Sequence, residues 1–342
     1  MKRFCIGVDS YSLQPLALSP LEVLDWVYAH GGEGVQFSDV QLKADQRLDE
    51  AFLRELRQRA DQLGLYLEWG GAQHIPLDLE SWQPKDILPI NIAAARQAAA
   101  LGTRVVRSCS GGLMRWNDAA PPTETLLREM ARALKVQEAL WTDLDVVLAI
   151  ELHFEFTTFE LLRVFEMCGA KPGGWLGVCL DTMNLLTMLE EPVAGTERIL
   201  PWVVATHIKD GAMTTSPAGL VSFTTPIGDG LVDFERICRL LATLERPVHL
   251  SIEDHGGSFD IPVNDPAFRA RFPDLTEQEL GQLKQIAHEG QRRIAEGQLT
   301  ITDRGDWPRL CEDRVAGDIA SLKEIVFKVE RSGADSSDRR EG

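Results

Sequence analysis

Four polar residues in the second half of the chain are of types that bind divalent metal ions or move protons: Glu151, Asp181, His207 and Glu253. Carboxylates brought close together repel one another and raise each other's pKa values unless a cation lies between them. Three oxygen donors and one imidazole suit Mn²⁺, Mg²⁺, Co²⁺ or Fe²⁺ better than a tetrahedral structural zinc. Each residue taken singly is explained equally well as a helix cap or as the partner of a lysine. The four together favour a metal centre.

The elements that must position these residues are short, β-branched, apolar runs. They alternate with amphipathic segments long enough for a crossover helix. Eight such runs predict strands, at Arg3–Asp9, Gly34–Asp39, Tyr66–Gly71, Thr103–Ser108, Val146–His153, Trp175–Asp181, Trp202–Asp210 and Pro247–Asp254.

The intervening segments predict helices. Ser19 and Pro20 form an N-cap and a first helical position, and Gly64 and Gly102 end two of the apolar periodic segments. Further helices are expected at Leu48–Leu63, Ile87–Leu101, Thr123–Trp141, Thr158–Cys168, Leu185–Leu200, Phe234–Leu244, Thr276–Glu296 and Asp303–Arg331.

Strict alternation of strand and helix predicts a parallel α/β fold, and eight units favour a closed (β/α)8 TIM barrel over an open sheet. No GxGxxG follows the first strand, so the usual dinucleotide-binding signal is absent. We expect a barrel over residues 1–300 and a C-terminal helical extension over 301–342, with its last residues, SGADSSDRREG, disordered.

In such a barrel, active-site groups lie where strands end and the following loops begin. The four candidate ligands close consecutive strands. Glu151, His207 and Glu253 also share alternating faces with residues that could point inward. The sequence therefore predicts that all four converge on one metal ion.

Composition limits the partners. The net charge of −17 opposes binding to nucleic acid and to anionic membrane surfaces. No apolar run is long enough for a membrane helix, and MKRFCIGVDS is expected to be a first strand rather than a signal peptide. The six scattered cysteines include no CxxC pair, which favours a reducing cytoplasm.

Five motifs together resemble the sugar phosphate isomerase/epimerase superfamily, the xylose-isomerase-like barrels that include ketose 3-epimerases, inosose dehydratases and endonuclease IV. The resemblance covers roughly residues 1–260. The motifs are ELH at 151–153, LDTMN at 180–184, HIKD at 207–210, GDGLVDF at 228–234 and SIED at 251–254.

The resemblance implies that Glu151, Asp181, His207 and Glu253 bind one divalent metal, with Mn²⁺ as first choice and Mg²⁺, Co²⁺ or Fe²⁺ as alternatives. It also implies that Glu151 and Glu253 are the catalytic acid/base pair. The substrate would be a sugar or keto-sugar, with proton abstraction next to a carbonyl and a metal-stabilised enediolate. Few histidines and the acidic charge disfavour the endonuclease branch.

The chain departs from the ketose 3-epimerases at two places. Those enzymes usually have His where Asn184 stands and Arg roughly where Met213 stands, and both residues contact substrate. A lyase that uses the same enolate chemistry on a keto-sugar, keto-inositol or 3-keto-glycoside is therefore an alternative. A non-catalytic sugar-binding or subunit barrel is a second alternative, and a homo-oligomer contact through the C-terminal segment is left open.

Further residues are candidates for substrate contacts, each with a structural alternative. His153 and Lys209 share faces with Glu151 and His207, and Lys209 could stabilise an oxyanion or pair with Asp210 or Glu253. Arg107 could hold a substrate oxygen or form a salt bridge in the barrel mouth. Asn184 and His74 could line the pocket, and Trp69 and Trp116 could stack on a sugar or pack in the core.

Overall fold

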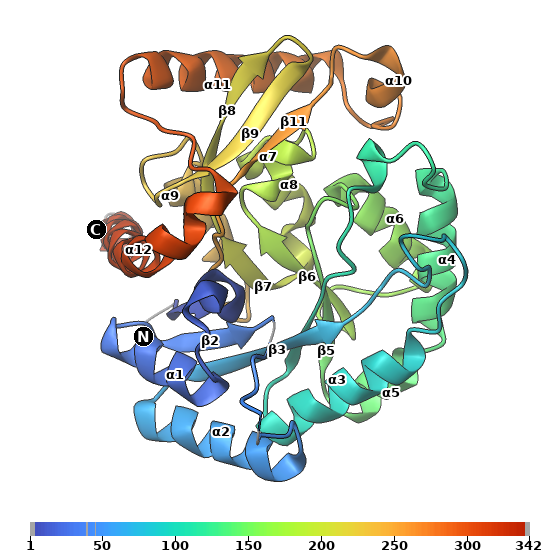
Figure 1. Ribbon diagram of the computed structural model, residues 1–342, viewed down its shortest axis with the longest axis vertical. Coiled ribbons are helices and arrows are strands. Elements are labelled where there is room, and N and C mark those ends of the chain that lie inside the picture. The colour runs from blue at the N-terminus through green and yellow to red at the C-terminus, as the bar shows by residue number, and fades with distance from the viewer. Residues whose placement is uncertain (1–3, 39, 45, 339–342) are drawn as a thin grey trace.

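The computed structural model describes residues 4–38, 40–44 and 46–338. Eight parallel strands close into a barrel in the order β1-β10-β7-β6-β5-β4-β3-β2, with helices around it (Figure 1). All eight predicted strands are confirmed. Seven are shorter than predicted, and β3 is one residue longer. They are β1 (Ile6–Asp9), β2 (Gly34–Phe37), β3 (Tyr66–Ala72), β4 (Val105–Ser108), β5 (Val147–Glu151), β6 (Leu176–Asp181), β7 (Val203–Ile208) and β10 (Leu250–Ile252).

The predicted helix boundaries follow from local chemistry. Helix α1 begins with a capping box between Ser19 and Glu22, and Pro20 occupies its first turn. Gly64 and Gly102 end two helices with φ values of 69° and 68°, a conformation that costs glycine little. The helices of this first half are α1 (Pro20–Ala29), α2 (Glu50–Leu63) and α3 (Leu88–Leu101).

Two predicted helices are each divided into two. The segment expected at 123–141 forms α4 (Thr123–Lys135) and α5 (Glu138–Asp143), and the segment expected at 185–200 forms α7 (Asn184–Thr187) and α8 (Pro192–Ile199). Pro192 opens α8, where its missing N–H costs no hydrogen bond. Helices α6 (Thr158–Cys168) and α9 (Phe234–Leu241) lie where they were expected.

A second, three-stranded antiparallel sheet was not predicted. It has the order β11-β9-β8 and consists of β8 (Asp210–Ser216), β9 (Gly219–Thr225) and β11 (Ser258–Ile261). The run expected as one strand at 202–210 thus ends at Ile208, and a new strand begins at Asp210. Short helix α10 (Pro266–Arg269) follows β11.

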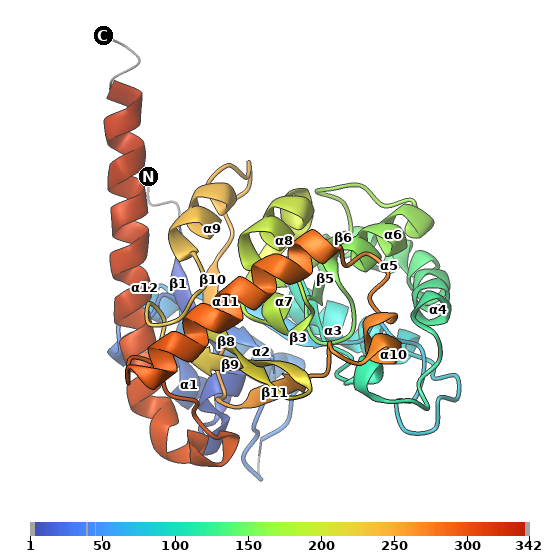
Figure 2. The same ribbon diagram turned by 90° about the horizontal axis from the view of Figure 1, so that it is seen from above.

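Helix α11 (Glu277–Ala295) lies across the small sheet (Figures 1 and 2). The approach is close: a Cβ at Gly290 would lie 1.9 Å from the carbonyl oxygen of Met213. Only glycine permits this contact. Met213 is consequently buried in β8 beneath α11.

Helix α12 (Trp307–Asp338) contacts β1, β10 and α9. It therefore lies between the last and first barrel strands, where the eighth helix of a TIM barrel packs, and its C-terminal half extends past the barrel (Figure 2). We propose that the barrel domain includes α12, rather than ending at residue 300. The helix continues to Asp338, and residues 339–342 of the expected disordered end lie outside the described residues. None of the described helices is both long and apolar enough to cross a bilayer.

Candidate metal and substrate site

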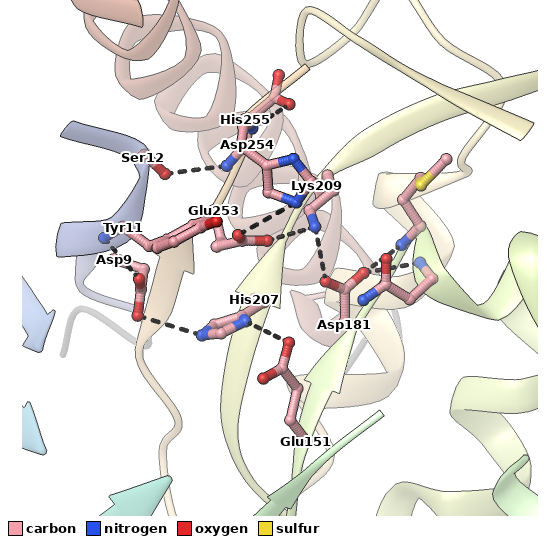
Figure 3. A network of polar contacts seen from close by, with 12 residues as sticks. Asp9, Tyr11, Ser12, Glu151, Asp181, His207, Lys209, Glu253, Asp254 and His255 are labelled. Atoms are coloured by element: carbon pink, nitrogen blue, oxygen red, sulfur yellow. Dashed lines mark hydrogen bonds and ion pairs between the residues drawn. The ribbon is translucent and has the colours of Figure 1, made fainter. Parts of the chain in front are cut away.

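The four predicted ligands converge at the carboxyl ends of neighbouring strands. Glu151 ends β5, Asp181 ends β6, His207 lies near the end of β7 and Glu253 follows β10. Asp181 and His207 stand opposite each other in the β6–β7 register. Figure 3 shows their side chains pointing toward a common centre, and all four are buried.

Three of the four are close enough to share one ion. Donor atoms of Glu151, Asp181 and His207 all lie within 4.8 Å of one another. The Nδ1 atom of His207 is 3.1 Å from Glu151 Oε1. Its Nε2 atom is 3.3 Å from Asp9 Oδ2 and also contacts the side-chain oxygen of Gln36.

Asp9 was missed by the sequence reasoning. It ends β1, is fully buried and is bound by Ser38 and by the N–H of Tyr11. Its signal was available, because it closes the first apolar run just as Asp181 closes the sixth. What the sequence did not show is that the Asp9 carboxylate reaches His207 from the far side of β10.

Glu253 joins the cluster through Lys209. The Lys209 ammonium lies 3.2 Å from Asp181 Oδ2 and also contacts Glu253. Lys209 is 2% exposed, so its charge is shielded little by water. The structure thus supports pairing with Glu253, one of the two interpretations drawn from the sequence, and adds Asp181 as a second partner.

The pKa values show how strongly the cluster attracts positive charge. Burial alone would raise the pKa of Glu151, but Arg107 and His207 outweigh it and hold that pKa well below its usual range. Burial would likewise raise the pKa of Glu253, yet Lys209 and nearby histidines bring it to about 2. Burial and the charge of Glu253 raise the pKa of Asp181, against the influence of Lys209.

The donor set fits a divalent cation. Burial disfavours a charged imidazole, but Cys179, Glu151 and Asp9 more than compensate and raise the pKa of His207 well above its usual value. In this structure a protonated His207 and the Lys209 ammonium therefore neutralise the carboxylates of the cluster. A bound divalent ion would supply that positive charge instead. Carboxylate oxygens with one imidazole are donors that Mn²⁺, Mg²⁺ and Fe²⁺ accept.

Other predicted contact residues surround this centre. Arg107 forms an ion pair with Glu151. His153 lies 3.2 Å from Glu155, another buried acid. His74 is fully buried with Nδ1 2.7 Å from Ser108, and burial lowers its pKa to about 4, so it is neutral at physiological pH.

Asn184 is held by its backbone and has an unsatisfied side chain. Its N–H donates to Asp181 Oδ1 over 2.7 Å. Its amide is buried, and neither the nitrogen nor the oxygen has a hydrogen-bond partner among the described residues. A buried amide that is left unpaired costs free energy, which a bound ligand could recover.

Trp69 and Trp116 are held elsewhere. The Trp69 indole donates to Gln97 of α3 over 3.1 Å. The Trp116 indole donates to the carbonyl of Asp260 over 2.8 Å, so it fastens β11. Both positions match the packing alternative.

The aromatic side chains beside His153 are different ones. Phe154 packs on the His153 ring with centroids 4.2 Å apart, and Phe259 of β11 packs on Phe154 at 4.3 Å. Phe154 was not singled out from the sequence. Phe259 belongs to the unpredicted sheet.

Comparisons with known proteins agree on the fold. The family model described as xylose isomerase-like TIM barrel matches residues 24–286. The chain is 28% identical over 229 residues to 3-oxo-isoapionate decarboxylase of Pectobacterium atrosepticum, covering 66% of this chain and 74% of that protein. A solved L-ribulose 3-epimerase superposes with a TM-score of 0.62 at 17% identity and covers 98% of both chains. A xylose isomerase-like barrel protein from Mycobacterium smegmatis, solved with magnesium, has a TM-score of 0.57 at 16% identity, covering 83% of this chain and 98% of that one.

Proposed function

We propose that this chain, which belongs to the xylose isomerase-like TIM barrel family, is a metal-dependent isomerase or epimerase of a small keto-sugar. The observation that carries the proposal is the convergence of Glu151, Asp181, His207 and Glu253 at the mouth of the barrel, with both glutamates buried and ionised. Ionised, water-excluded carboxylates on either side of a bound substrate are suited to take a proton from carbon.

The four residues would hold one divalent cation. When bound, the cation would polarise the substrate carbonyl and make the adjacent C–H more acidic. The cluster's attraction for positive charge supports this assignment, and Mn²⁺ is our first choice for the ion.

The glutamates then move the proton. One carboxylate removes the proton from the carbon next to the carbonyl, and the C–H electron pair passes into the enediolate. Return of a proton to the opposite face of the same carbon gives the epimer, and return to the neighbouring carbon gives the isomer. Glu151 and Glu253 come from opposite ends of the set of strands that carries the cluster, β5, β6, β7 and β10.

Two cationic side chains orient the acids and the substrate. Arg107 keeps Glu151 ionised, and Lys209 does the same for Glu253. Lys209 also lies where it can donate to a substrate oxygen that gains negative charge. The unpaired amide of Asn184 is available to a substrate hydroxyl or carbonyl.

A decarboxylase of a 3-oxo sugar acid is a second candidate, supported by the 28% identical relative and by the two cations. In that reaction the bond to the carboxylate breaks, CO₂ leaves, and the electron pair of that bond remains as the enolate. A water molecule supplies the proton for the enolate carbon, and a glutamate passes it on. Arg107 and Lys209 supply positive charge that could bind a substrate carboxylate.

Incubation with keto-sugars and 3-oxo sugar acids in D₂O, with Mn²⁺, separates the candidates by NMR. Deuterium on a carbon of a sugar that has lost no other atoms supports isomerisation or epimerisation. Release of CO₂ supports the decarboxylase, and an enone or a freed aglycone supports an elimination. If the wild type and Glu151→Gln bind sugar equally well and neither turns it over, the result would instead support a non-catalytic barrel and refute the proposal.

A further inference from the structure

A second group of metal-binding side chains lies outside the four-residue centre. The Sγ atom of Cys109, a ring nitrogen of His153 and a carboxylate oxygen of Glu155 all lie within 4.8 Å of one another. The group shares no residue with the cluster of Glu151, Asp181 and His207.

The fold brings these three together from two loops. Cys109 directly follows β4, and His153 and Glu155 lie in the loop between β5 and α6. Strands β4 and β5 are paired in register up to their ends, with Ser108 opposite Ile150. The loops therefore leave the barrel side by side.

The loop that carries His153 and Glu155 is fixed at its far end. Thr157 and Glu160 form a reciprocal capping box at the start of α6. Glu160 is in turn held by an ion pair with Arg115. Such a loop presents its side chains at little further entropic cost.

Glu155 gives a second, independent indication of a ligand. Its side chain is 1% exposed, and neither of its oxygens accepts a hydrogen bond from the described part of the chain. Among the described residues its one ion-pair partner is His153 Nδ1, at 3.2 Å, which pairs with the carboxylate in this way only when the imidazole is protonated. Buried carboxylates are normally hydrogen-bonded, paired with charge or bound to metal.

We propose that Cys109, His153 and Glu155 form a second cation site, suited to Zn²⁺ or Co²⁺. A thiolate, an imidazole and a carboxylate are borderline-soft donors, which favours these ions over Mg²⁺ or Ca²⁺. Three protein ligands leave a fourth tetrahedral position open to water or to a ligand oxygen. The Cys109 thiol releases its proton to solvent when the ion binds.

Titration of the metal-free full-length protein with Co²⁺ tests the site by absorbance. A thiolate-to-cobalt charge-transfer band in the near ultraviolet requires a cysteine ligand, which the centre of Glu151, Asp181, His207 and Glu253 does not contain. We expect the band in the wild type and its loss in Cys109→Ser. Cys238→Ser is the matched control, because Cys238 is a buried cysteine of α9 that belongs to neither centre and should not affect the band.

Co²⁺ binding without the band would overturn the proposal, and so would a band that survives Cys109→Ser. If Cys109→Ser does not fold, alkylation of the wild type followed by peptide mass spectrometry replaces it. Zn²⁺ should slow alkylation of Cys109 at least about tenfold and leave Cys5, which is also partly exposed, unchanged. Equal rates with and without Zn²⁺ would also overturn it. Because these readouts do not use turnover, they stand or fall separately from the proposed reaction.

Discussion

Lys209 and a bound metal ion must compete for the same carboxylates. The ammonium lies 3.2 Å from Asp181 and contacts Glu253, and both acids belong to the proposed ligand set. A divalent ion in the cluster would stand within a few ångströms of this like charge. We therefore predict that Lys209→Met destabilises the metal-free protein and, at the same time, strengthens its response to metal.

The magnitudes follow from burial. Removing one partner of a buried ion pair costs about 3–5 kcal/mol, and we expect a loss of that order in the free energy of unfolding measured with EDTA. Repulsion between unit charges about 4 Å apart is about 4 kcal/mol at an effective dielectric constant of 20. Relief of part of it should tighten metal binding about tenfold, or about 1.4 kcal/mol.

Urea unfolding with EDTA and with excess Mn²⁺ measures both effects. At free metal about 100 times the wild-type Kd, the wild type should gain about 2.7 kcal/mol, and Lys209→Met about 4.1 kcal/mol. Arg198→Met is the matched control, because Arg198 of α8 is the cation that pairs with another buried acid, Glu190. The control should lose stability without changing the response to metal. A metal response in Lys209→Met equal to or smaller than that of the wild type would refute the reasoning.

Three further predictions follow from the same site and its supports. Under saturating Mn²⁺, Glu151→Gln and Glu253→Gln should each lower kcat by about 10²–10⁴-fold. If both variants keep a steady-state kcat within tenfold of the wild type, the acid/base assignment is contradicted. Asn184→Leu should raise the free energy of unfolding by about 1–3 kcal/mol, because it removes an unpaired buried amide. The same variant should bind substrate more weakly. A variant that is less stable than the wild type would contradict the conclusion that this amide is unpaired. Burial raises the pKa of Asp318 to about 7, so between about pH 4 and 7 the folded protein holds a proton that the unfolded chain has released. The free energy of unfolding therefore falls as pH rises through that window, by up to about 1.4 kcal/mol per pH unit, and Asp318→Asn should flatten this slope in urea titrations at several pH values.

The sequence by itself determined the barrel. Short, nearly continuous apolar runs with amphipathic helices between them leave few other ways to bury both faces of eight parallel strands. It also identified the four candidate ligands, because the carboxyl ends of parallel strands lie at the same end of the barrel regardless of the loop conformations. In the GDGLVDF motif, Asp233 is the N-cap of α9 and accepts a hydrogen bond from the N–H of Arg236.

The sequence did not indicate what holds the GDGLVDF loop in place. The carboxylate of Asp210 accepts N–H groups from Gly228, Gly230 and Val232, and so ties the loop to the start of β8. Those contacts join residues about twenty positions apart, and local propensity carries no information about such a pairing.

Only the tertiary structure decided which side chains face one another across the barrel mouth. The position of Lys209 between Asp181 and Glu253, the approach of Asp9 to His207, and the grouping of Cys109 with Glu155 all depend on strand order and stagger. The small sheet of β8, β9 and β11 likewise joins segments on both sides of β10. Long-range pairings of this kind are fixed by packing and by the closure of the sheet, so a pattern read along one chain identifies the donors but not their neighbours.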